Sequence, residues 1–577
     1  IEHENVRVTF FNQPWLAQNI AVGQEVAVYG TYNAAKAALT GMKMINATAN
    51  ALDPIYPASK QITAKTIRHL VELAWADVRG TMPDLVPLSL RQKYRLLDRN
   101  TQIEHMHFPT DMPAAKAARR SAAFEEFFIF QMRLQLLKLA DQKFAGEGIA
   151  YDAQALKKFE AGLPFTLTTA QKKVIAEILQ DQHRPRHMNR LLQGDVGSGK
   201  TVVAAMAMYA VVTAGLQAAI MAPTEILAQQ HALNLAQLFD RAGVQLRIEL
   251  LTSGLRAAAR RQILEDLENG EIDILVGTHA LLQPDVAFHH LGLAVIDEQH
   301  RFGVNQRAAL RENGVNPDIL AMTATPIPRT LSITAYGEMD VSIIDQLPSG
   351  RKAIETKRLS HNQLDAALAF VKQQLDDGAQ AYIVTPLIEE SESLDVQNAT
   401  AMYEAMQLEL PEYTIGLLHG RLSNDEKKQL MADFKANRIQ VLVATTVIEV
   451  GVDVPNASIM LILDADRFGL AQLHQLRGRV GRGSRQSYTL LIADPKTDYG
   501  TARLDAMVAT TNGFVLAQKD LELRGSGDIL GTKQSGVPEF VVGDPIKDLT
   551  MMEIAQQEAI ALVSQENWDQ QPENQAL

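Results

Sequence analysis

The chain has 577 residues, of which 46% are hydrophobic, and a formal net charge of -12. It contains no cysteine, which excludes disulfides, thiolate zinc sites and cysteine nucleophiles and agrees with a cytoplasmic location. At about 100–200 residues for each domain, the length predicts three to four domains. No apolar run approaches the roughly 18 residues of a membrane span, so we expect no membrane partner.

The charge is unevenly spread. Residues 1–100 hold 11 Lys and Arg against 8 Asp and Glu, or +3, so the remainder carries -15. Binding to nucleic acid depends on local basic surface rather than on the whole-chain sum, so composition leaves that partner open. The chain begins with Ile1 rather than Met, and we expect further sequence upstream.

The first 100 residues have the patterns of short strands. Segments 6–11, 25–30 and 40–45 combine alternation with β-favouring residues, and Gly and Asn separate them. Such strands suit a small barrel, and an OB-fold is one option. We therefore expect a barrel domain over 1–100.

A long helix is predicted next. Residues 114–144 contain no Pro or Gly and are rich in Ala, Leu, Phe, Glu and Lys, and they lie within a helical linker expected over 101–162. The phenylalanines of this helix are expected to pack rather than to bind a ligand, and they are Phe124, Phe127, Phe128 and Phe130.

Residues 163–495 repeat a pattern of strand, loop and helix. The strand candidates are 190–192, 218–222, 274–276, 293–296, 381–384, 441–444 and 460–463. Such alternation predicts α/β domains with parallel sheets covered by helices on both faces. The length predicts two in tandem, 163–345 and 346–495, with a hinge at 345–350. Residues 496–577 form a tail, and we expect its acidic, Gln-rich end to fray.

A phosphate-binding loop is the clearest motif. The segment that matches the P-loop pattern is Gly194-Asp195-Val196-Gly197-Ser198-Gly199-Lys200-Thr201. Its glycines let main-chain N–H groups curl around phosphate oxygens, Lys200 adds positive charge, and the Thr201 hydroxyl suits Mg²⁺. A short apolar strand precedes it and a predicted helix at 202–214 follows, which disfavours a plain Gly-rich turn. The sequence therefore predicts ATP and Mg²⁺ as cofactors.

Two adjacent carboxylates follow the apolar strand 293–296. An ATPase needs such a pair at its Mg²⁺, with Asp297 holding the metal and Glu298 orienting and deprotonating the attacking water. A solvated acidic turn is the alternative, and the P-loop upstream disfavours it.

The second tandem domain ends with a Gly-Arg segment at 472–482. Guanidiniums are permanently charged and forked, which suits the charge that develops on a γ-phosphate, so Arg479 and Arg482 are candidates for that role. Gln475 of the same segment joins the catalytic candidates. A plain nucleic-acid patch is the alternative for this segment.

These motifs, in this order and spacing, resemble superfamily 2 helicases. Five further segments match that superfamily: 222–225, 277–279, 322–326, 418–421 and 444–453. The resemblance implies two tandem RecA-like domains. It assigns contacts along one DNA strand to Thr224, Thr278 and Thr446, and coupling between ATP state and domain closure to Thr323 and Thr325.

The segment 165–171 is similar to the part of those helicases that recognises adenine. The resemblance makes Phe165 and Gln171 nucleotide-binding residues, with Gln171 as the reader. A Gln amide can both accept from and donate to an adenine edge.

Two strings narrow the match to the branch that RecG shares with the transcription-repair coupling factor: 297–304 and 323–330. The coupling factor carries a polymerase-binding module before its motor, and no counterpart is seen here. The region before this motor resembles instead the wedge domain of the RecG family, an OB-fold that splits DNA arms. Phe11 and Trp15 are then candidates to stack on parted bases, with packing in the barrel core as the alternative.

The tail resembles the translocation motif of the same branch, a helical hairpin followed by a loop that reaches toward duplex DNA. The residues that match are Arg503, Arg524 and Gln534, with glycines around Gln534. The resemblance implies that these residues couple ATP hydrolysis to movement. Ordinary surface charges and turns in a structural cap are the alternative.

The RecG resemblance implies an ATP-dependent translocase on double-stranded DNA that reverses stalled forks and migrates Holliday junctions in repair and recombination. It implies branched DNA as partner, single-strand DNA-binding protein as a further partner, and action as a monomer. An ATP-gated clamp on branched DNA and an RNA helicase with the same motor are the alternatives. Intact Lys200, Glu298 and Arg482 disfavour the clamp, and the wedge-like start and the tail disfavour RNA.

Overall fold

The structure is a computed structural model. It describes residues 7–10, 20–24, 26–33, 38–45, 52, 54–59, 61–142, 148–298, 317–335, 337, 339–348, 352–386, 392–446, 453–531 and 540–577. Phe11, Trp15 and Gln534 lie outside these residues, and so does the side chain of Arg524. The chain divides into two compact units, residues 1–133 with 540–577, and residues 134–539. Among the described helices, none has the length and apolar character to cross a membrane.

The first unit begins with three strands, β1 (Arg7–Phe10), β2 (Ala27–Asn33) and β3 (Ala38–Ile45), in the order β1-β3-β2. β3 pairs antiparallel with β2 and parallel with β1. The strands cross closely at Gly30, where a Cβ would lie 2.0 Å from the carbonyl oxygen of Thr40. All three strands overlap the segments predicted from sequence, and β2 and β3 extend beyond them.

The strand-rich part is shorter than the barrel expected over 1–100. Three helices follow it, α2 (Ala64–Val78), α3 (Leu88–Tyr94) and α4 (Arg99–His107). Residues 64–78 contain no Gly or Pro, and the Thr63 side chain caps α2 by accepting from the Thr66 N–H. Helix propensity and a good cap therefore end the strand-rich part before residue 64, and the expected barrel range is corrected accordingly.

Helix α5 (Met112–Gln142) confirms the predicted long helix. Phe124, Phe127 and Phe128 are buried. Phe127 and Phe130 both meet the ring of Phe540 edge-on, with centroids 5.1 and 5.3 Å apart. The phenylalanines thus pack, as predicted. Two of them contact Phe540, at the start of the C-terminal segment that belongs to this unit.

The end of the chain is folded onto the first unit. Helix α19 (Leu549–Val563) places Glu558 where it accepts hydrogen bonds from Lys93 Nζ at 2.7 Å and Tyr94 Oη at 2.5 Å. Asn574 is buried after the helix ends. The expected fraying of this end is therefore wrong, because its acidic and amide side chains have partners on α3 and within their own turn.

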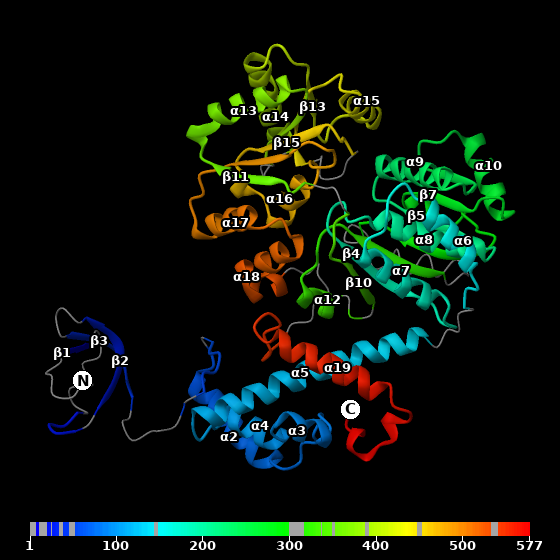
Figure 1. The fold of residues 1–577 in the computed structure, drawn as a ribbon. Helices are drawn as coiled ribbons and strands as arrows, with labels where there is room; N and C mark the ends of the chain where they lie inside the picture. Colours follow the sequence, from blue (N-terminus) through cyan, green and yellow to red (C-terminus); the bar gives the residue numbers. More distant parts are fainter. Residues whose placement is uncertain are drawn as a thin grey trace. The chain divides into compact units, whose positions relative to one another are not determined.

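The second unit contains two parallel sheets, each with helices on its faces (Figure 1). The first sheet has the order β10-β4-β9-β8-β5-β7-β6, with β4 (Asn189–Gly194), β5 (Gln217–Met221), β6 (Ile248–Leu251), β7 (Ile274–Gly277), β8 (Leu291–Ile296), β9 (Asp318–Thr323) and β10 (Asp340–Ile344). The second has the order β11-β16-β15-β12-β14-β13, with β11 (Glu355–Leu359), β12 (Gln380–Val384), β13 (Ile415–Leu418), β14 (Val441–Ala444), β15 (Ala457–Ile462) and β16 (Tyr488–Ile492).

The strands in the middle of each sheet carry apolar side chains on both of their faces, which explains why they lie between two layers of helices. Successive side chains of a strand point to opposite faces, so Leu293 and Val295 join one core cluster and Ala294 and Ile296 another. The second sheet likewise separates two clusters. This double burial is what the near-continuous apolar strand segments predict, and it confirms tandem α/β domains.

Helices connect the strands. The first sheet carries α6 (Ala153–Gly162), α7 (Thr169–Gln182), α8 (Lys200–Thr213), α9 (Glu225–Arg241), α10 (Ala257–Glu268) and α12 (Arg329–Ala335). The second carries α13 (Leu364–Asp376), α14 (Glu392–Glu409), α15 (Asn424–Lys435), α16 (Leu470–Arg477), α17 (Asp498–Ala509) and α18 (Gly513–Gly531). The expected hinge at 345–350 falls between β10 of the first sheet and β11 of the second.

Candidate active site

The P-loop lies at the carboxyl edge of the first sheet, between β4 and α8. Gly197 and Gly199 have φ values of 76° and 86°, a backbone region that side chains rarely adopt. A Cβ at Gly199 would also lie 2.2 Å from Gln171 Nε2. Both the turn and the close approach of the 165–171 segment therefore require glycine.

Lys200 is held by the loop's own carbonyl groups. Its Nζ donates to the main-chain oxygen of Gly194 at 2.7 Å and of Asp195 at 3.1 Å. Burial lowers the pKa of Lys200, while the charges of Glu298 and Asp297 raise it and that of Arg482 lowers it. An ammonium whose partners among the described residues are neutral oxygens fits a ligand with phosphate charge.

Gln171 links the predicted adenine-recognition segment to the P-loop. Its side chain is 2% exposed, with Oε1 accepting from the Thr168 N–H and Nε2 donating to the Ser198 carbonyl, both at 2.8 Å. These bonds use one N–H and one lone pair of an amide that offers two of each. Reading of adenine by the remaining pair stays a prediction.

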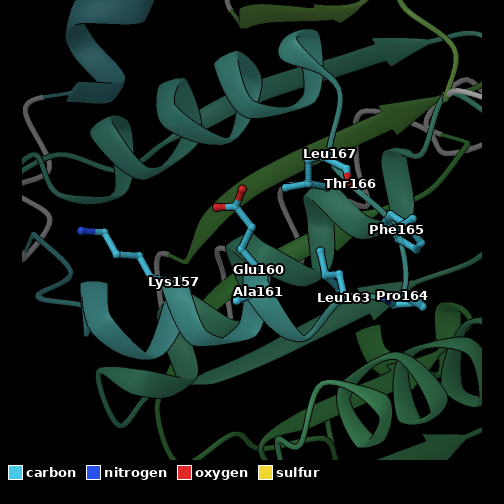
Figure 2. Close-up of a pocket in the computed structure, with 8 residues that line it drawn as sticks. All are labelled: Lys157, Glu160, Ala161, Leu163, Pro164, Phe165, Thr166 and Leu167. Carbon is cyan, nitrogen blue, oxygen red and sulfur yellow. The ribbon is translucent and has the colours of Figure 1, made fainter.

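Phe165 lines a pocket of about 450 Å³ beside this segment (Figure 2). Lys157 and Glu160 of α6 and the loop that follows that helix form its walls, and the Phe165 side chain is 48% exposed. Small-molecule sites have volumes of about 300–1,000 Å³. The role of Phe165 in nucleotide binding stays a prediction.

The acidic pair follows β8 at the same edge. His231 Nε2 lies 2.7 Å from Asp297 Oδ2, and the Glu298 N–H donates to Asp297 Oδ1 at 3.0 Å. Both carboxylate oxygens of Asp297 therefore have a partner that fixes the group. Burial acts to raise the pKa of Asp297, but the hydrogen bond and charge of His231 and the charge of Lys200 lower it overall.

Glu298 is in a different electrostatic state from its neighbour. Burial raises the pKa of Glu298, the charge of Asp297 adds to the rise, and the charges of Lys200 and Arg479 oppose it. Its φ of 52° is unusual for a residue other than glycine. Strained backbone and a raised pKa are features of catalytic carboxylates, because a group with raised pKa accepts a proton more readily.

The second sheet contributes two arginines to the same site. The charge of Arg479 acts to lower the pKa of Glu298, and that of Arg482 acts to lower the pKa of Lys200. Arg482 pairs with Asp453 and donates from Nε to the Gly478 oxygen at 3.2 Å. Gln475 is half-buried on α16, just before them. The structure thus brings the candidates of both domains together.

The sequence analysis missed two histidines at this site. His231 lies 66 residues before Asp297 in the sequence, and His474 Nε2 lies 2.5 Å from Asp195 Oδ1 although 279 residues separate them. Burial acts to raise the pKa of Asp195, and the hydrogen bond and charge of His474 lower it. No local sequence pattern indicates pairs of residues so far apart in the chain. The one available signal was that each histidine lies close in sequence to a helicase motif.

The predicted strand-contact threonines lie after strands, at the carboxyl edges. Thr224 follows β5 and caps α9, Thr278 follows β7, and Thr446 follows β14. Thr323 ends β9, and its hydroxyl lies 2.8 Å from that of Thr325. The edges that carry the nucleotide residues therefore carry these threonines too.

The tail helices α17 and α18 pack on the second sheet's domain. The Arg503 side chain on α17 donates to the main-chain oxygen of Phe468 and stacks over the Tyr499 ring at 4.4 Å. Arg524 lies within α18. The predicted helical hairpin is thus present, and Arg503 bonds to the motor domain.

Three family models match the chain. They are described as DEAD/DEAH box helicase at residues 168–333, helicase conserved C-terminal domain at 363–484, and ATP-dependent DNA helicase RecG, domain 3, C-terminal, at 510–577. The fold, the site and the first two matches define a helicase, with a P-loop domain followed by a second parallel-sheet domain.

Relatives narrow this class. The ATP-dependent DNA helicase RecG of Streptococcus pneumoniae is 51% identical over 98% of this chain and 84% of the relative, and that of Bacillus subtilis is 48% identical over 100% and 85%. A solved structure of RecG bound to a three-way DNA junction matches with a TM-score of 0.72 and 38% identity, over 95% of this chain and 74% of that one. The chain belongs to the RecG family of ATP-dependent DNA helicases.

Proposed function

We propose that this chain is an ATP-driven double-strand DNA translocase that binds branched DNA and drives fork reversal and Holliday junction branch migration. The observation that carries the proposal is the contact of the two domains at the P-loop, where His474 Nε2 of the second domain lies 2.5 Å from Asp195 Oδ1 of the first. A site split across two domains closes and opens with nucleotide state, which is how a motor converts hydrolysis into movement. The match to RecG on a three-way junction supports branched DNA as the substrate.

The residues of the P-loop and the acidic pair fit ATP and Mg²⁺. Lys200 would leave the carbonyl oxygens of Gly194 and Asp195 for the phosphates, and Thr201 and Asp297 would hold Mg²⁺. The metal supplies charge that neutralises the phosphates. Glu298, with its raised pKa, would take the proton of the attacking water.

The arginines and the threonines would link this chemistry to DNA. Arg479 and Arg482 would stabilise the charge that develops on the γ-phosphate, because guanidiniums stay charged when enclosed. Thr323 and Thr325 adjoin the site at the end of β9 and would report its state. We assign contacts along one DNA strand to three threonines at the carboxyl edges, namely Thr224, Thr278 and Thr446.

The decisive experiment uses a synthetic four-way junction and a model fork. The proposal expects conversion of both into duplex products that depends on hydrolysable ATP. Junction binding without conversion would instead favour an ATP-gated clamp. ATPase activity stimulated more by structured RNA than by branched DNA would favour an RNA helicase.

The wedge role of Phe11 and Trp15 has a test of its own. Stacking of a base on an aromatic ring contributes about 1–3 kcal/mol, so alanine at either position is expected to weaken junction binding by about 5- to 150-fold while the fold is kept. Titration of a labelled junction measures this. A loss of several kcal/mol of stability with unchanged binding per folded molecule would mark packing in the strand-rich domain instead.

A further inference from the structure

A histidine lies among apolar side chains on the buried side of α9. The buried residues of this helix are Ala228, His231, Leu235 and Phe239, and the three apolar ones belong to the core of the first sheet's domain. Their spacing places all four on one stripe of the helix, so the histidine is withdrawn from water. A buried polar group costs stability unless it is hydrogen-bonded, so the partner of His231 shows what its position serves.

That partner is the carboxylate that would hold Mg²⁺. His231 Nε2 lies 2.7 Å from Asp297 Oδ2. Because an ionised carboxylate only accepts hydrogen bonds, Nε2 carries the proton and is the donor. The Nδ1 atom of the ring is buried and has no hydrogen-bond partner among the described residues. Within that part of the chain, the bond to Asp297 is therefore the single hydrogen bond of the His231 ring.

The backbone of Asp297 is fixed to a different element. Its N–H donates to the Met221 oxygen at the end of β5 at 2.9 Å, and its Oδ1 accepts from the Glu298 N–H at 3.0 Å. The main chain and one carboxylate oxygen thus follow the sheet, whereas Oδ2 follows α9 through His231. A movement of α9 against β5 would therefore turn the carboxylate about its own side-chain bonds.

The start of α9 adjoins the proposed DNA path. Thr224, to which we assign a strand contact, caps the helix by accepting from the Leu227 N–H at 3.4 Å. His231 follows seven residues later, which is about 10 Å at the rise of an α-helix. Rigid helices and hydrogen bonds are the elements that carry coupling between separate sites. A strand bound at Thr224 would thus act on Asp297 through one helix and one hydrogen bond.

We propose that His231 positions the Asp297 carboxylate for Mg²⁺ and makes that position respond to DNA at the start of α9. The inference rests on the proposed function for the roles of Asp297 and Thr224, and it gives the histidine no part in proton transfer. Loss of a group that orients a metal-holding carboxylate typically costs about 10- to 100-fold in metal affinity or activity. A histidine that only packs would instead be replaceable by an apolar side chain of similar size.

Nucleotide affinity measures the position of the carboxylate without turnover. Calorimetry gives the dissociation constant of a non-hydrolysable ATP analogue for the full chain with Mg²⁺ and with EDTA, and the ratio of the two is the gain that the metal supplies. We expect His231→Leu, which keeps the bulk and removes the donor, to lower this gain by about tenfold or more. His231→Gln, whose amide N–H can replace the donor, should restore most of it. Leu233→Ala, at a 52% exposed side chain of the same helix, is the matched control and should keep the gain.

The response to DNA is measured in the same way. A saturating amount of a synthetic junction is expected to change the metal-dependent gain in the unmodified chain and in His231→Gln, and to leave it unchanged in His231→Leu. Because coupling between binding sites is reciprocal, the analogue with Mg²⁺ should alter hydrogen exchange of the α9 amides at 227–231 in the unmodified chain, and the analogue with EDTA should not. The exchange measurement needs no variant and carries the test if His231→Leu fails to fold.

Three results would overturn the inference. The first is a metal-dependent gain in folded His231→Leu that equals that of the unmodified chain. The second is a response of this gain to DNA that is absent from the unmodified chain or survives in His231→Leu. The third is exchange of α9 that does not respond to the analogue with Mg²⁺. Junction conversion by the unmodified chain alongside any of these would leave the proposed function standing, whereas a gain that depends on His231 and on DNA, without junction conversion, would do the reverse.

Discussion

The two parallel sheets of the motor share a fold and differ in what they contribute to one site. The first sheet leads from β4 into the P-loop and from β8 into Asp297 and Glu298, so a lysine and two carboxylates meet at its edge. The second sheet's domain has no P-loop sequence, and it supplies Arg479 and Arg482 after α16. In the proposed function, the first domain would therefore bind the phosphates, and the second would supply the arginines that respond to them.

This division predicts different defects for the two regions. Changes at the first sheet's edge should stop the chemistry, because the lysine and the two carboxylates are the groups proposed to carry it. Changes in the tail, which packs on the second sheet's domain, should leave ATP hydrolysis unchanged and weaken its coupling to movement along DNA. Changes at the opposite edge of the first sheet should affect stability alone. The predictions below follow that order, from the largest effect on turnover to the smallest.

Lys200→Ala should have the largest effect. The ammonium is the P-loop's positive charge, and its loss is expected to lower ATP turnover by roughly 10³-fold or more. Junction binding should be nearly unchanged, because DNA affinity comes from many separate phosphate contacts. A phosphate-release assay and a junction titration measure the two. Lys173→Ala, at a 76% exposed side chain on α7, is the control and should keep both activities. Turnover near normal in Lys200→Ala would contradict the assignment.

Glu298→Gln should lower turnover by about 10²–10⁴-fold while ATP still binds, because an amide cannot take the proton of water. Single-turnover hydrolysis and nucleotide titration separate the two steps. The control is Glu271→Gln, where a 59% exposed carboxylate pairs with Arg247 and does not reach the site. Loss of ATP binding in Glu298→Gln would indicate a structural role, and normal hydrolysis would assign the base elsewhere.

The part of this site that could be predicted from sequence is the part made of local motifs. The P-loop, the acidic pair and the arginines each depend on residues a few positions apart, whose spacing follows from backbone geometry. His231 and His474 were missed because their partners, Asp297 and Asp195, are near only after the chain has folded. Side chains that orient others are therefore the hardest class to infer from a single sequence.

The fold shows the same limit. The sequence analysis does not name six of the strands in the two sheets. Four of them, β6, β10, β11 and β13, lie at sheet edges, whereas β9 and β16 are central. An edge strand such as β11, with the sequence ETKRL, has fewer buried positions than a central one and so lacks the continuous apolar run that revealed β5 or β8. The strand patterns before residue 46 predict a barrel over 1–100, whereas the composition of residues 64–78 and the Thr63 cap favour a helix.

Arg503→Ala tests the tail. Its guanidinium bonds to the Phe468 oxygen and stacks on Tyr499, so its loss should loosen α17 without touching the P-loop. We expect DNA-stimulated ATP turnover to stay within about twofold while branch migration falls by about tenfold, and Arg524→Ala and Gln534→Ala to behave alike. Arg358→Ala, which breaks the exposed pair with Asp505, is the control. A parallel loss of both activities, or of neither, would make the tail a structural cap.

Asp318→Asn should leave turnover unchanged, because Asp318 begins β9 at the amino edge of the first sheet, away from the nucleotide residues. Burial raises the pKa of Asp318 to about 7, the charge of Asp181 adds to the rise, and the hydrogen bond from the Met188 N–H opposes it. The unfolded group titrates near pH 4, so the folded state binds the extra proton between about pH 4 and 7. The stability contributed by this group is therefore present at low pH and is lost as the pH rises through 7.

Asparagine resembles the protonated acid and does not titrate. The stability of Asp318→Asn relative to the unmodified chain should consequently increase by roughly 1–4 kcal/mol between pH 5 and pH 8. The Nδ2 group placed at the buried Oδ2, which has no hydrogen-bond partner among the described residues, adds a cost that is the same at both pH values. Hydrogen exchange of the β4 and β9 amides, corrected for the intrinsic rate at each pH, measures this difference. Asp273→Asn, just before β7 on the same edge, is the control and accepts from the Arg247 N–H. A stability difference that does not depend on pH would mean that the Asp318 carboxyl has the same pKa in the folded and unfolded states. Burial at the amino edge of the sheet would then not raise the pKa of a carboxyl, as it does for Glu298 at the carboxyl edge.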